Sequence, residues 1–161
     1  MKILIVSDTH RENSNFMKVF EKEKPIDMLI HCGDIEGSEY TYSTLCNCPM
    51  HMVAGNNDFF ADTKRDEEFY IGKYKIWLTH GHHYYVPMDN EILKDEARSR
   101  GINIVMYGHT HKPVIDIDNG VIALNPGSLT YPRQEGRLPS YIIMSIDDDG
   151  EASFELKYVV E

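Results

Sequence analysis

The stretch INIVMYGHTH, residues 102–111, joins an apolar run to a glycine and two closely spaced histidines. Residues 102–107 are mostly apolar, which is typical of a buried strand. Gly108 then lets the backbone turn sharply. On a continuing strand, His109 and His111 would point the same way and could share one ion, whereas in a loop they could diverge toward two ions. The remainder of the chain has to decide between these two arrangements.

Four further segments have the same form, an apolar strand candidate that ends in Asp, Asn or His side chains. They are KILIVSDTH (residues 2–10), DMLIHCGD (27–34), MHMVAGNND (50–58) and YKIWLTHGHH (74–83). Each motif alone is typical of a turn or a helix cap. Open α/β sheets, however, bind ligands beyond the carboxyl ends of their strands. Five such motifs in succession therefore indicate a metal site, because divalent cations remove the cost of gathering carboxylates and imidazoles in one cleft.

The order of strand and helix patterns predicts an α/β fold. Helices are expected near residues 15–24, 37–46 and 89–100, between the strand candidates. Turn signals at Gly72-Lys73, Asn119-Gly120 and Asp149-Gly150 each separate two strand-like runs and predict three hairpins. The first part of the chain is therefore βαβ-like and the last third is antiparallel. Together they predict a single domain over residues 1–161, with two sheets and the helices outside them.

Composition and charge exclude several classes of protein. The formal net charge is −10, from 16 Lys and Arg against 26 Asp and Glu, whereas generic binding of nucleic acid or anionic membranes requires a basic surface. The chain has no apolar run of 18 residues that could span a membrane. Its apolar start is too short for the core of a signal peptide. The odd count of three cysteines argues against a disulfide framework, so we expect reduced thiols in a cytoplasmic protein.

Six motifs occur in the order found in one known family. They are SDTH (7–10), CGD (32–34), GNND (55–58), THGHH (79–83), GHTH (108–111) and NPGS (125–128). The chain therefore resembles the calcineurin-like metallophosphoesterases over roughly residues 1–133, and its small size resembles the YfcE-like phosphodiesterase branch. The resemblance implies a four-layer α-β-β-α sandwich of mixed sheets with antiparallel C-terminal hairpins. That fold agrees with the one predicted from the residue patterns.

The resemblance also implies which residues bind metal. Asp8, His10 and His111 would hold one ion, Asn56, His80 and His109 would hold a second, and Asp34 would bridge both. The two histidines of the loop would thus serve different ions. This mixed set of nitrogen and oxygen donors suits Mn²⁺, Fe, Ni²⁺ or Zn²⁺ better than Mg²⁺ or Ca²⁺. We expect two divalent ions, with Mn²⁺ as the active species and Ni²⁺, Zn²⁺ or Fe as alternatives.

The expected activity is that of a metal-dependent phosphodiesterase. A hydroxide bridging the two ions would attack phosphorus in line, and the catalytic candidates are Asp34, Asn56, Asn57 and His82. Many relatives carry a histidine where this chain has Asn57, which cannot protonate a leaving group. We therefore expect a preference for good leaving groups such as aryl phosphodiesters, or a different acid, for which His82 and His83 are candidates. Asp58 would either orient a ligand imidazole or cap a turn.

Two other functions compete with this interpretation. One is a phosphomonoesterase acting on a nucleotide or a small metabolite. The other is a non-catalytic scaffold on the same fold, like the retromer subunit of the family, although the four histidine ligands argue against it. For partners we expect a small phosphodiester or phosphomonoester substrate, no stable nucleic-acid binding, no membrane, and a possible homo-oligomer.

Several residues near the motif loops have two interpretations. Arg11, Arg133 and Ser128 would contact phosphate oxygens or would be ordinary surface and turn residues. The aromatic residues Phe59, Phe60, Tyr84 and Tyr85 would form a rim that stacks a base or aryl group, or would pack against the loops.

Overall fold

The computed structural model describes residues 1–59 and 61–161. In that part of the chain the elements follow in the order β1 (Lys2–Val6), α1 (Ser14–Glu23), β2 (Met28–His31), α2 (Glu39–Leu45), β3 (Met50–Met52), β4 (Asp66–Ile71), β5 (Tyr74–Thr79), α3 (Glu91–Ser99), β6 (Ile104–Met106), β7 (Pro113–Asp118), β8 (Val121–Pro126), β9 (Ser140–Ile146) and β10 (Ala152–Tyr158). The elements predicted from the sequence are all present, with boundaries shifted by at most two residues.

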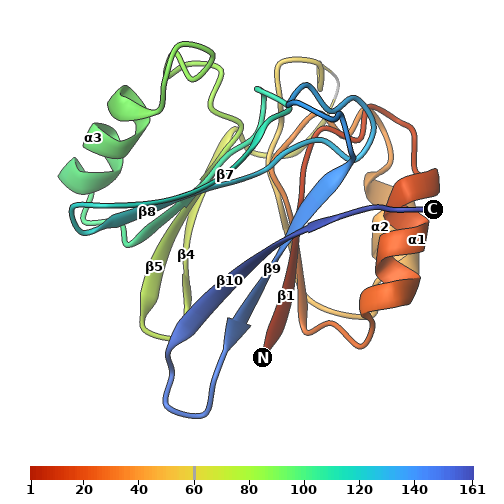
Figure 1. Ribbon diagram of the computed structural model, residues 1–161, viewed down its shortest axis with the longest axis horizontal. Coiled ribbons are helices and arrows are strands. Elements are labelled where there is room, and N and C mark those ends of the chain that lie inside the picture. The colour runs from red at the N-terminus through yellow and green to blue at the C-terminus, as the bar shows by residue number, and fades with distance from the viewer. Residues whose placement is uncertain (60) are drawn as a thin grey trace.

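The strands form two mixed sheets. One has the order β10-β9-β1-β2-β3 and the other has the order β4-β5-β6-β8-β7. Each sheet has three neighbouring parallel strands, β1-β2-β3 and β5-β6-β8, and antiparallel strands complete it. The predicted hairpins β4-β5, β7-β8 and β9-β10 are confirmed. Figure 1 shows α1 and α2 on the outer side of the first sheet and α3 on the outer side of the second.

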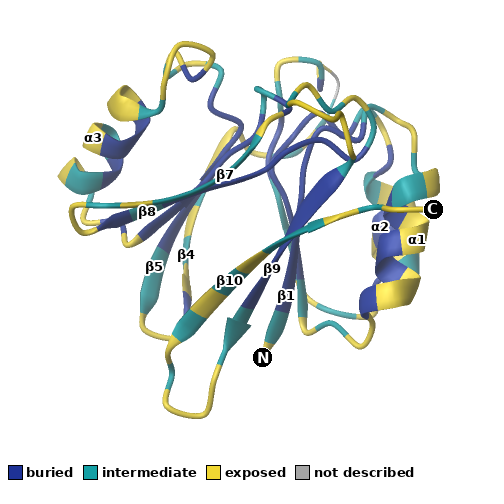
Figure 2. Ribbon diagram, viewed as in Figure 1, coloured by how far each residue is buried: buried dark blue, intermediate teal, exposed yellow. Residues whose placement is uncertain are grey.

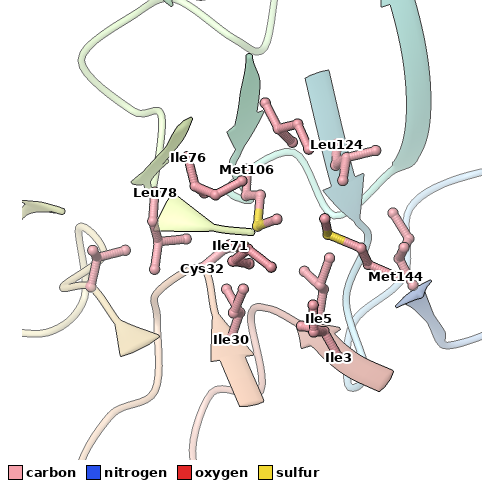
Figure 3. Packing of buried hydrophobic residues seen from close by; sticks show 13 residues of the cluster. Ile3, Ile5, Ile30, Cys32, Ile71, Ile76, Leu78, Met106, Leu124 and Met144 are labelled. Atoms are coloured by element: carbon pink, nitrogen blue, oxygen red, sulfur yellow. The ribbon is translucent and has the colours of Figure 1, made fainter. Parts of the chain in front are cut away.

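The apolar runs of the central strands are explained by burial on both faces of each sheet. In β1, Ile3 and Ile5 point into the cluster between the two sheets, whereas Leu4 and Val6 point into the cluster beneath α1 and α2. Figure 3 shows Ile5 and its neighbours facing side chains from the second sheet, such as Met106. A four-layer α-β-β-α sandwich follows from this alternation.

The helices bury one apolar stripe each. In α1, Phe16, Val19 and Phe20 recur at helical spacing and are buried against the first sheet. In α3, Leu93 and Ala97 pack against the outer face of the second sheet. Figure 2 shows these helices buried toward the sheets and exposed on their outer sides. The described residues contain no helix that is long and apolar enough to cross a membrane.

Both sheets send loops to the same edge of the sandwich. Backbone hydrogen bonds join these loops directly: the Asp8 N–H donates to the Gly33 carbonyl at 3.0 Å, and the Gly108 N–H donates to the His80 carbonyl at 3.1 Å. The first bond joins the loops after β1 and β2 of one sheet, and the second joins the loops after β5 and β6 of the other. The carboxyl ends of β1, β2, β3, β5 and β6 therefore surround one common site, at the top of Figure 1.

Candidate metal centre

The loops after the strands are tightly curled. Among the candidate ligands, five have a left-handed backbone, a conformation that residues other than glycine rarely adopt: Asp8 (φ 53°), His10 (47°), Asp34 (58°), His109 (72°) and His111 (59°). Such strained residues cluster at functional sites because the surrounding contacts hold them in place. The strain therefore points to a site whose side-chain directions are set by the fold.

Two glycines permit the close approach of these loops. A Cβ atom on Gly55 would lie 2.2 Å from Asp34 Oδ1. A Cβ atom on Gly108 would lie 2.1 Å from Ser7 Oγ and 2.6 Å from Asp8 Oδ2. Any side chain at either position would therefore collide with a loop that carries a candidate ligand.

Asp8, His10 and His111 form the first group of donors. His111 Nε2 lies 3.2 Å from Asp8 Oδ1, and His10 Nε2 lies 3.6 Å from the same oxygen. The two imidazole nitrogens lie 3.2 Å from each other. These three side chains come from loops about 100 residues apart in the chain, and they converge on one point.

The second group contains the remaining predicted ligands. Asn56 Oδ1 lies 3.0 Å from His80 Nε2 and 3.0 Å from His109 Nδ1. Asp34 Oδ2 lies 3.4 Å from His80 Nε2. The structure thus brings all seven predicted ligands together around two neighbouring groups of donors.

Two carboxylates connect these groups. Asp34 Oδ2 lies 3.7 Å from His10 Nε2 of the first group as well as close to His80 of the second. Asp8 Oδ1 also lies 3.8 Å from His80 Nε2. Asp8, Asp34 and His80 have ligand atoms within 4.8 Å of one another, as do Asp8, His10 and His111. Both aspartates are therefore positioned between the groups, whereas the family resemblance implied this place for Asp34 alone.

The state of Asp8 indicates what the site is built to hold. Its side chain is fully buried. Its Oδ2 accepts hydrogen bonds from the Ser7 hydroxyl at 2.6 Å and from the His109 N–H at 3.0 Å. Its Oδ1, however, is buried without a hydrogen-bond partner in the described part of the chain. A buried, unpaired carboxylate oxygen is costly, and a cation among the surrounding imidazoles removes that cost. The donor set therefore fits divalent cations.

Electrostatics in the cluster favour cations. Burial lowers the pKa of His80, but the Asp8 and Asp34 carboxylates beside it raise that pKa to about 9. Burial likewise raises the pKa of Asp34, but hydrogen bonding and attraction from His80 lower it to about 2. The carboxylates thus stay ionised at neutral pH, and in the absence of a metal His80 takes up a proton in its place.

Binding of metal should therefore release protons. An imidazole must be neutral to bind a metal, so below pH 9 a cation has to displace the proton of His80. We expect metal affinity to fall as pH decreases from about 9, by up to about tenfold per pH unit for each displaced proton. Isothermal titration calorimetry in two buffers of different ionisation enthalpy measures the protons released. His51→Gln, which removes a histidine outside the cluster, should behave like the parent protein. Affinity independent of pH between 6 and about 9 would contradict this expectation.

Hydrogen bonds behind the ligands orient three of the imidazoles. The Nδ1–H of His80 donates to the Cys32 carbonyl at 2.7 Å, and that of His111 donates to the Tyr131 carbonyl at 2.7 Å. His10 Nδ1 lies 3.0 Å from Glu36 Oε2. Each contact directs Nε2 toward the donor cluster, as outer-shell partners of metal ligands do. The roles of Glu36 and Tyr131 were not predicted, because neither residue stands in a recognisable motif.

Asp58 caps a backbone turn. Its carboxylate accepts hydrogen bonds from the N–H groups of Asp34 at 2.8 Å, Ile35 at 3.1 Å, Glu36 at 2.7 Å and Gly55 at 2.8 Å. In the described residues it makes no hydrogen bond to a ligand imidazole. Of the two roles considered for Asp58, the structure therefore supports the cap, and this cap joins the loops after β2 and β3.

Asn57 holds the central carboxylate. Its backbone N–H donates to Asp34 Oδ1 at 2.9 Å and its Nδ2 donates to Asp34 Oδ2 at 3.0 Å. His82 lies nearby, with its ring 5.4 Å from that of His80 and 4.0 Å from that of His83. Burial and the charge of His80 lower the pKa of His82 to about 4. His82 is therefore neutral at pH 7, which makes it a weak proton donor there.

The turn NPGS serves the backbone of the site. The buried Ser128 hydroxyl donates to the Asp8 carbonyl at 2.7 Å and accepts the N–H of Tyr131 at 2.8 Å. Asn125 Nδ2 donates to the Gly108 carbonyl at 3.1 Å. The interpretation of Ser128 as a phosphate contact does not fit its burial, and its role in this structure is to fix the first ligand loop.

The aromatic rim is only partly present. Phe59 and Tyr85 are exposed beside the ligand loops, whereas Tyr84 packs edge-on against Trp77, at 5.1 Å between ring centroids. Phe60 lies outside the described residues. Exposed Tyr131 adds a ring 5.5 Å from that of His10.

Comparison with known proteins agrees with the geometry of the site. A family model described as the calcineurin-like phosphoesterase superfamily domain matches residues 1–149. A probable metallophosphoesterase of Methanocaldococcus jannaschii is 34% identical over 155 residues, which cover 94% of this chain and 79% of the relative. A phosphodiesterase of the same organism is 31% identical over 145 residues, covering 79% of this chain and 83% of the relative.

Solved structures share the whole architecture. A predicted phosphoesterase from Streptococcus pneumoniae superposes with a TM-score of 0.78 at 26% identity, over 97% of each chain. Vps29 from Entamoeba histolytica, in complex with Zn²⁺, superposes with a TM-score of 0.77 at 25% identity, over 98% of this chain and 99% of Vps29. The arrangement of two sheets and outer helices is therefore common to this chain and these two solved structures.

Proposed function

This chain belongs to the calcineurin-like phosphoesterase superfamily, and we propose that it is a metal-dependent phosphodiesterase with a binuclear centre. The observation that carries the proposal is the buried Asp8 Oδ1, which accepts no hydrogen bond in the described residues and lies 3.2–3.8 Å from three imidazole nitrogens. The relative named as a phosphodiesterase supports the choice of a diester over a monoester. The substrate is a small phosphodiester.

In this proposal each group of donors holds one ion. Asp8, His10 and His111 bind the first, and Asn56, His80 and His109 bind the second. Asp34 contacts both. When bound, the ions lower the pKa of a water molecule and offset the negative charge on the phosphoryl oxygens. Mn²⁺ is the ion that we propose for activity, because the mixed nitrogen and oxygen donors suit it.

The side chains of the protein orient this centre. Asn57 donates to both oxygens of Asp34 and so fixes the carboxylate shared by the two groups. The carbonyls of Cys32 and Tyr131 fix the rings of His80 and His111. Pre-orientation of this kind reduces the reorganisation needed as charge develops on the substrate. In contrast, Asn57 has no proton to give a leaving group, and His82 is a weak donor at neutral pH.

Removal and restoration of metal tests the proposal. Protein stripped with a chelator should not hydrolyse bis-p-nitrophenyl phosphate, and addition of Mn²⁺ should restore turnover by at least about 10³-fold, because the ions supply most of the transition-state stabilisation. Ni²⁺, Zn²⁺ and Mg²⁺ are compared in the same assay. Release of p-nitrophenolate measures the rate, and elemental analysis measures bound metal. Tight binding of metal without turnover would point to a narrower substrate, whereas neither binding nor turnover would exclude the enzyme.

Because Asn57 cannot protonate a leaving group, the protein should favour leaving groups that need little protonation. The substitution Asn57→His tests this expectation. We expect the variant to depend less on the acidity of the leaving phenol, because an imidazole at this position can donate a proton, an effect worth roughly 10²-fold. The measurement is the slope of log kcat against leaving-group pKa for a series of aryl phosphodiesters. Asn57→Gln, which keeps the amide, is the matched control. An unchanged slope in Asn57→His would contradict the role given to this position, and a steeper slope in His82→Gln would identify His82 as the acid.

Two alternatives remain distinguishable. A phosphomonoesterase would hydrolyse p-nitrophenyl phosphate faster than the diester. A scaffold, which is the alternative suggested by the likeness to Vps29, would turn over neither substrate, whether or not it binds metal. We further propose one domain over residues 1–161 in the cytoplasm. The pairing of β9 with β1 supports the first point, and the three free cysteines support the second.

A further inference from the structure

The unpaired cations of this acidic protein gather around the candidate metal centre. In the structure, which leaves out only Phe60, half of the lysines and arginines make no ion pair with a carboxylate: Arg11, Lys18, Lys22, Lys64, Arg65, Lys112, Arg133 and Arg137. Five of these line hollows that border the ligand loops: Arg11, Arg65, Lys112, Arg133 and Arg137. A net charge of −10 makes this gathering unexpected for a surface with no anionic ligand.

One of these hollows is a cleft beside His109, which carries two of the cations. The cleft has a volume of about 560 Å³, which lies in the range of small-molecule binding sites. Its apolar wall includes Val86, Met88 and Val114, and its cations are Lys112 and Arg133. It is therefore suited to a molecule with an organic part and a negative charge.

The two cations are held at the ligand loop. Lys112 directly follows His111 in the chain, and its N–H donates to Thr110 Oγ1 at 3.2 Å. The Arg133 N–H donates to the His111 carbonyl at 3.0 Å. Their backbone positions relative to the donor cluster are therefore fixed by the same loop that supplies a ligand, while their exposed side chains can reach into the cleft.

The acidic residues of the cleft already have partners. Asp116 Oδ2 lies 3.0 Å from Lys94 Nζ and accepts a hydrogen bond from Asn90 Nδ2 at 3.0 Å. Asp89 Oδ1 accepts the N–H of Glu91 at 3.0 Å, at the start of α3. The positive charges of Lys112 and Arg133 are thus free to pair with a bound anion.

We infer that this cleft seats a second anionic group of the substrate, a phosphate on the part of the diester that stays away from the reacting phosphorus. The inference rests on the proposed phosphodiesterase function and narrows its substrate class to diesters that carry an additional phosphate. Arg133 provides a planar guanidinium suited to paired hydrogen bonds with phosphate, and Lys112 provides a point charge. The organic part of the substrate lies along the apolar wall of the cleft.

A matched pair of substrates tests this inference on the metal-loaded protein. Thymidine 5′-(p-nitrophenyl phosphate) and its 3′-phosphorylated analogue contain the same scissile bond and differ by one phosphate. We expect the parent protein to prefer the 3′-phosphorylated compound by about tenfold in kcat/KM at low ionic strength, a preference that added salt reduces. In Lys112→Ala/Arg133→Ala the ratio of the two kcat/KM values should fall to about one.

Two further variants separate the cleft from general charge. Lys18→Ala/Lys22→Ala removes two unpaired cations from α1, away from the metal centre, and should retain the tenfold preference. Lys112→Arg conserves the charge and should also retain it. Circular dichroism establishes that each variant is folded.

The outcomes for the inference and for the proposed function differ. If the parent protein hydrolyses neither substrate with any metal, the second-anion site is overturned, and if it also binds no metal, the phosphodiesterase itself is excluded. If it hydrolyses both at equal kcat/KM, or if the control pair on α1 loses the preference as well, the second-anion site is overturned and the phosphodiesterase stands. Loss of preference confined to Lys112→Ala/Arg133→Ala supports the site.

Discussion

Asp34→Asn should lose about 10³-fold in kcat toward bis-p-nitrophenyl phosphate while the protein stays folded. Asp34 Oδ2 lies 3.4 Å from His80 Nε2 and 3.7 Å from His10 Nε2, so this carboxylate reaches both groups of donors. An amide has the same shape but no charge, and it cannot neutralise two cations. In addition, the new NH₂ group would face the donating Nδ2 of Asn57. The loss should therefore appear in metal binding and in turnover together.

The matched control for this substitution is Asp148→Asn, an identical chemical change in the exposed turn between β9 and β10. Rates with Mn²⁺, the number of bound ions per chain and thermal unfolding are measured for both variants. The control should resemble the parent protein in all three. Asp34→Asn should bind fewer ions and unfold at a somewhat lower temperature, because the substitution removes the carboxylate that attracts His80 and accepts the Nδ2 hydrogen bond of Asn57, but it should stay folded at the assay temperature. Turnover within tenfold of the parent value would refute the shared role of Asp34.

Asp58→Ala should lower the free energy of unfolding by about 3–5 kcal/mol. The Asp58 carboxylate accepts hydrogen bonds from four backbone N–H groups, on Asp34, Ile35, Glu36 and Gly55. Removing the acceptor leaves these donors without their partner in a largely buried loop, and each unsatisfied donor costs about 1–3 kcal/mol before water or relaxation offsets it. The same loop carries Asp34, so metal affinity should fall as well.

Urea denaturation of the metal-free proteins measures this effect without the contribution of bound ions. Asp58→Asn keeps one acceptor oxygen and should lose roughly half as much stability. Asp148→Ala, which removes an exposed carboxylate, should change it by less than about 0.5 kcal/mol. If Asp58→Ala loses activity with little change in stability, the cap is not its main role, and orientation of a ligand becomes the better explanation.

Most residues of the candidate site could be predicted from the sequence, because the motifs that mark them are local. Asp8 and Asp34 stand two and three residues beyond β1 and β2, which are apolar parallel strands of one sheet, and such strands end at the same edge. Residue type and position along a strand are therefore enough to bring these side chains together. By contrast, Glu36 and the Tyr131 carbonyl are oriented by loop conformations, and no pattern in the sequence reports them.

Where the sequence left two roles open for a residue, contacts with residues distant in the chain determined which role it has. Ser128 bonds to the carbonyl of Asp8, 120 residues away, and this contact excludes the exposed position that a phosphate contact needs. Tyr84 packs on Trp77 instead of joining a rim, whereas Phe59 stays exposed. Both outcomes depend on which surfaces meet after folding.

The sequence by itself determined the elements and the chemistry of their ends. Neighbouring residues of a central strand, such as Ile3 and Leu4, are buried on opposite faces of the sheet, so the whole strand is apolar. A continuous apolar run therefore predicts a sheet that is covered on both faces. The tertiary structure alone decided that β9 inserts antiparallel beside β1, and that Asp8 also reaches the second group of donors. The physical reason is range: periodicity and turn residues act over a few positions, whereas strand pairing and the left-handed loops that carry the ligands depend on packing between segments more than 100 residues apart.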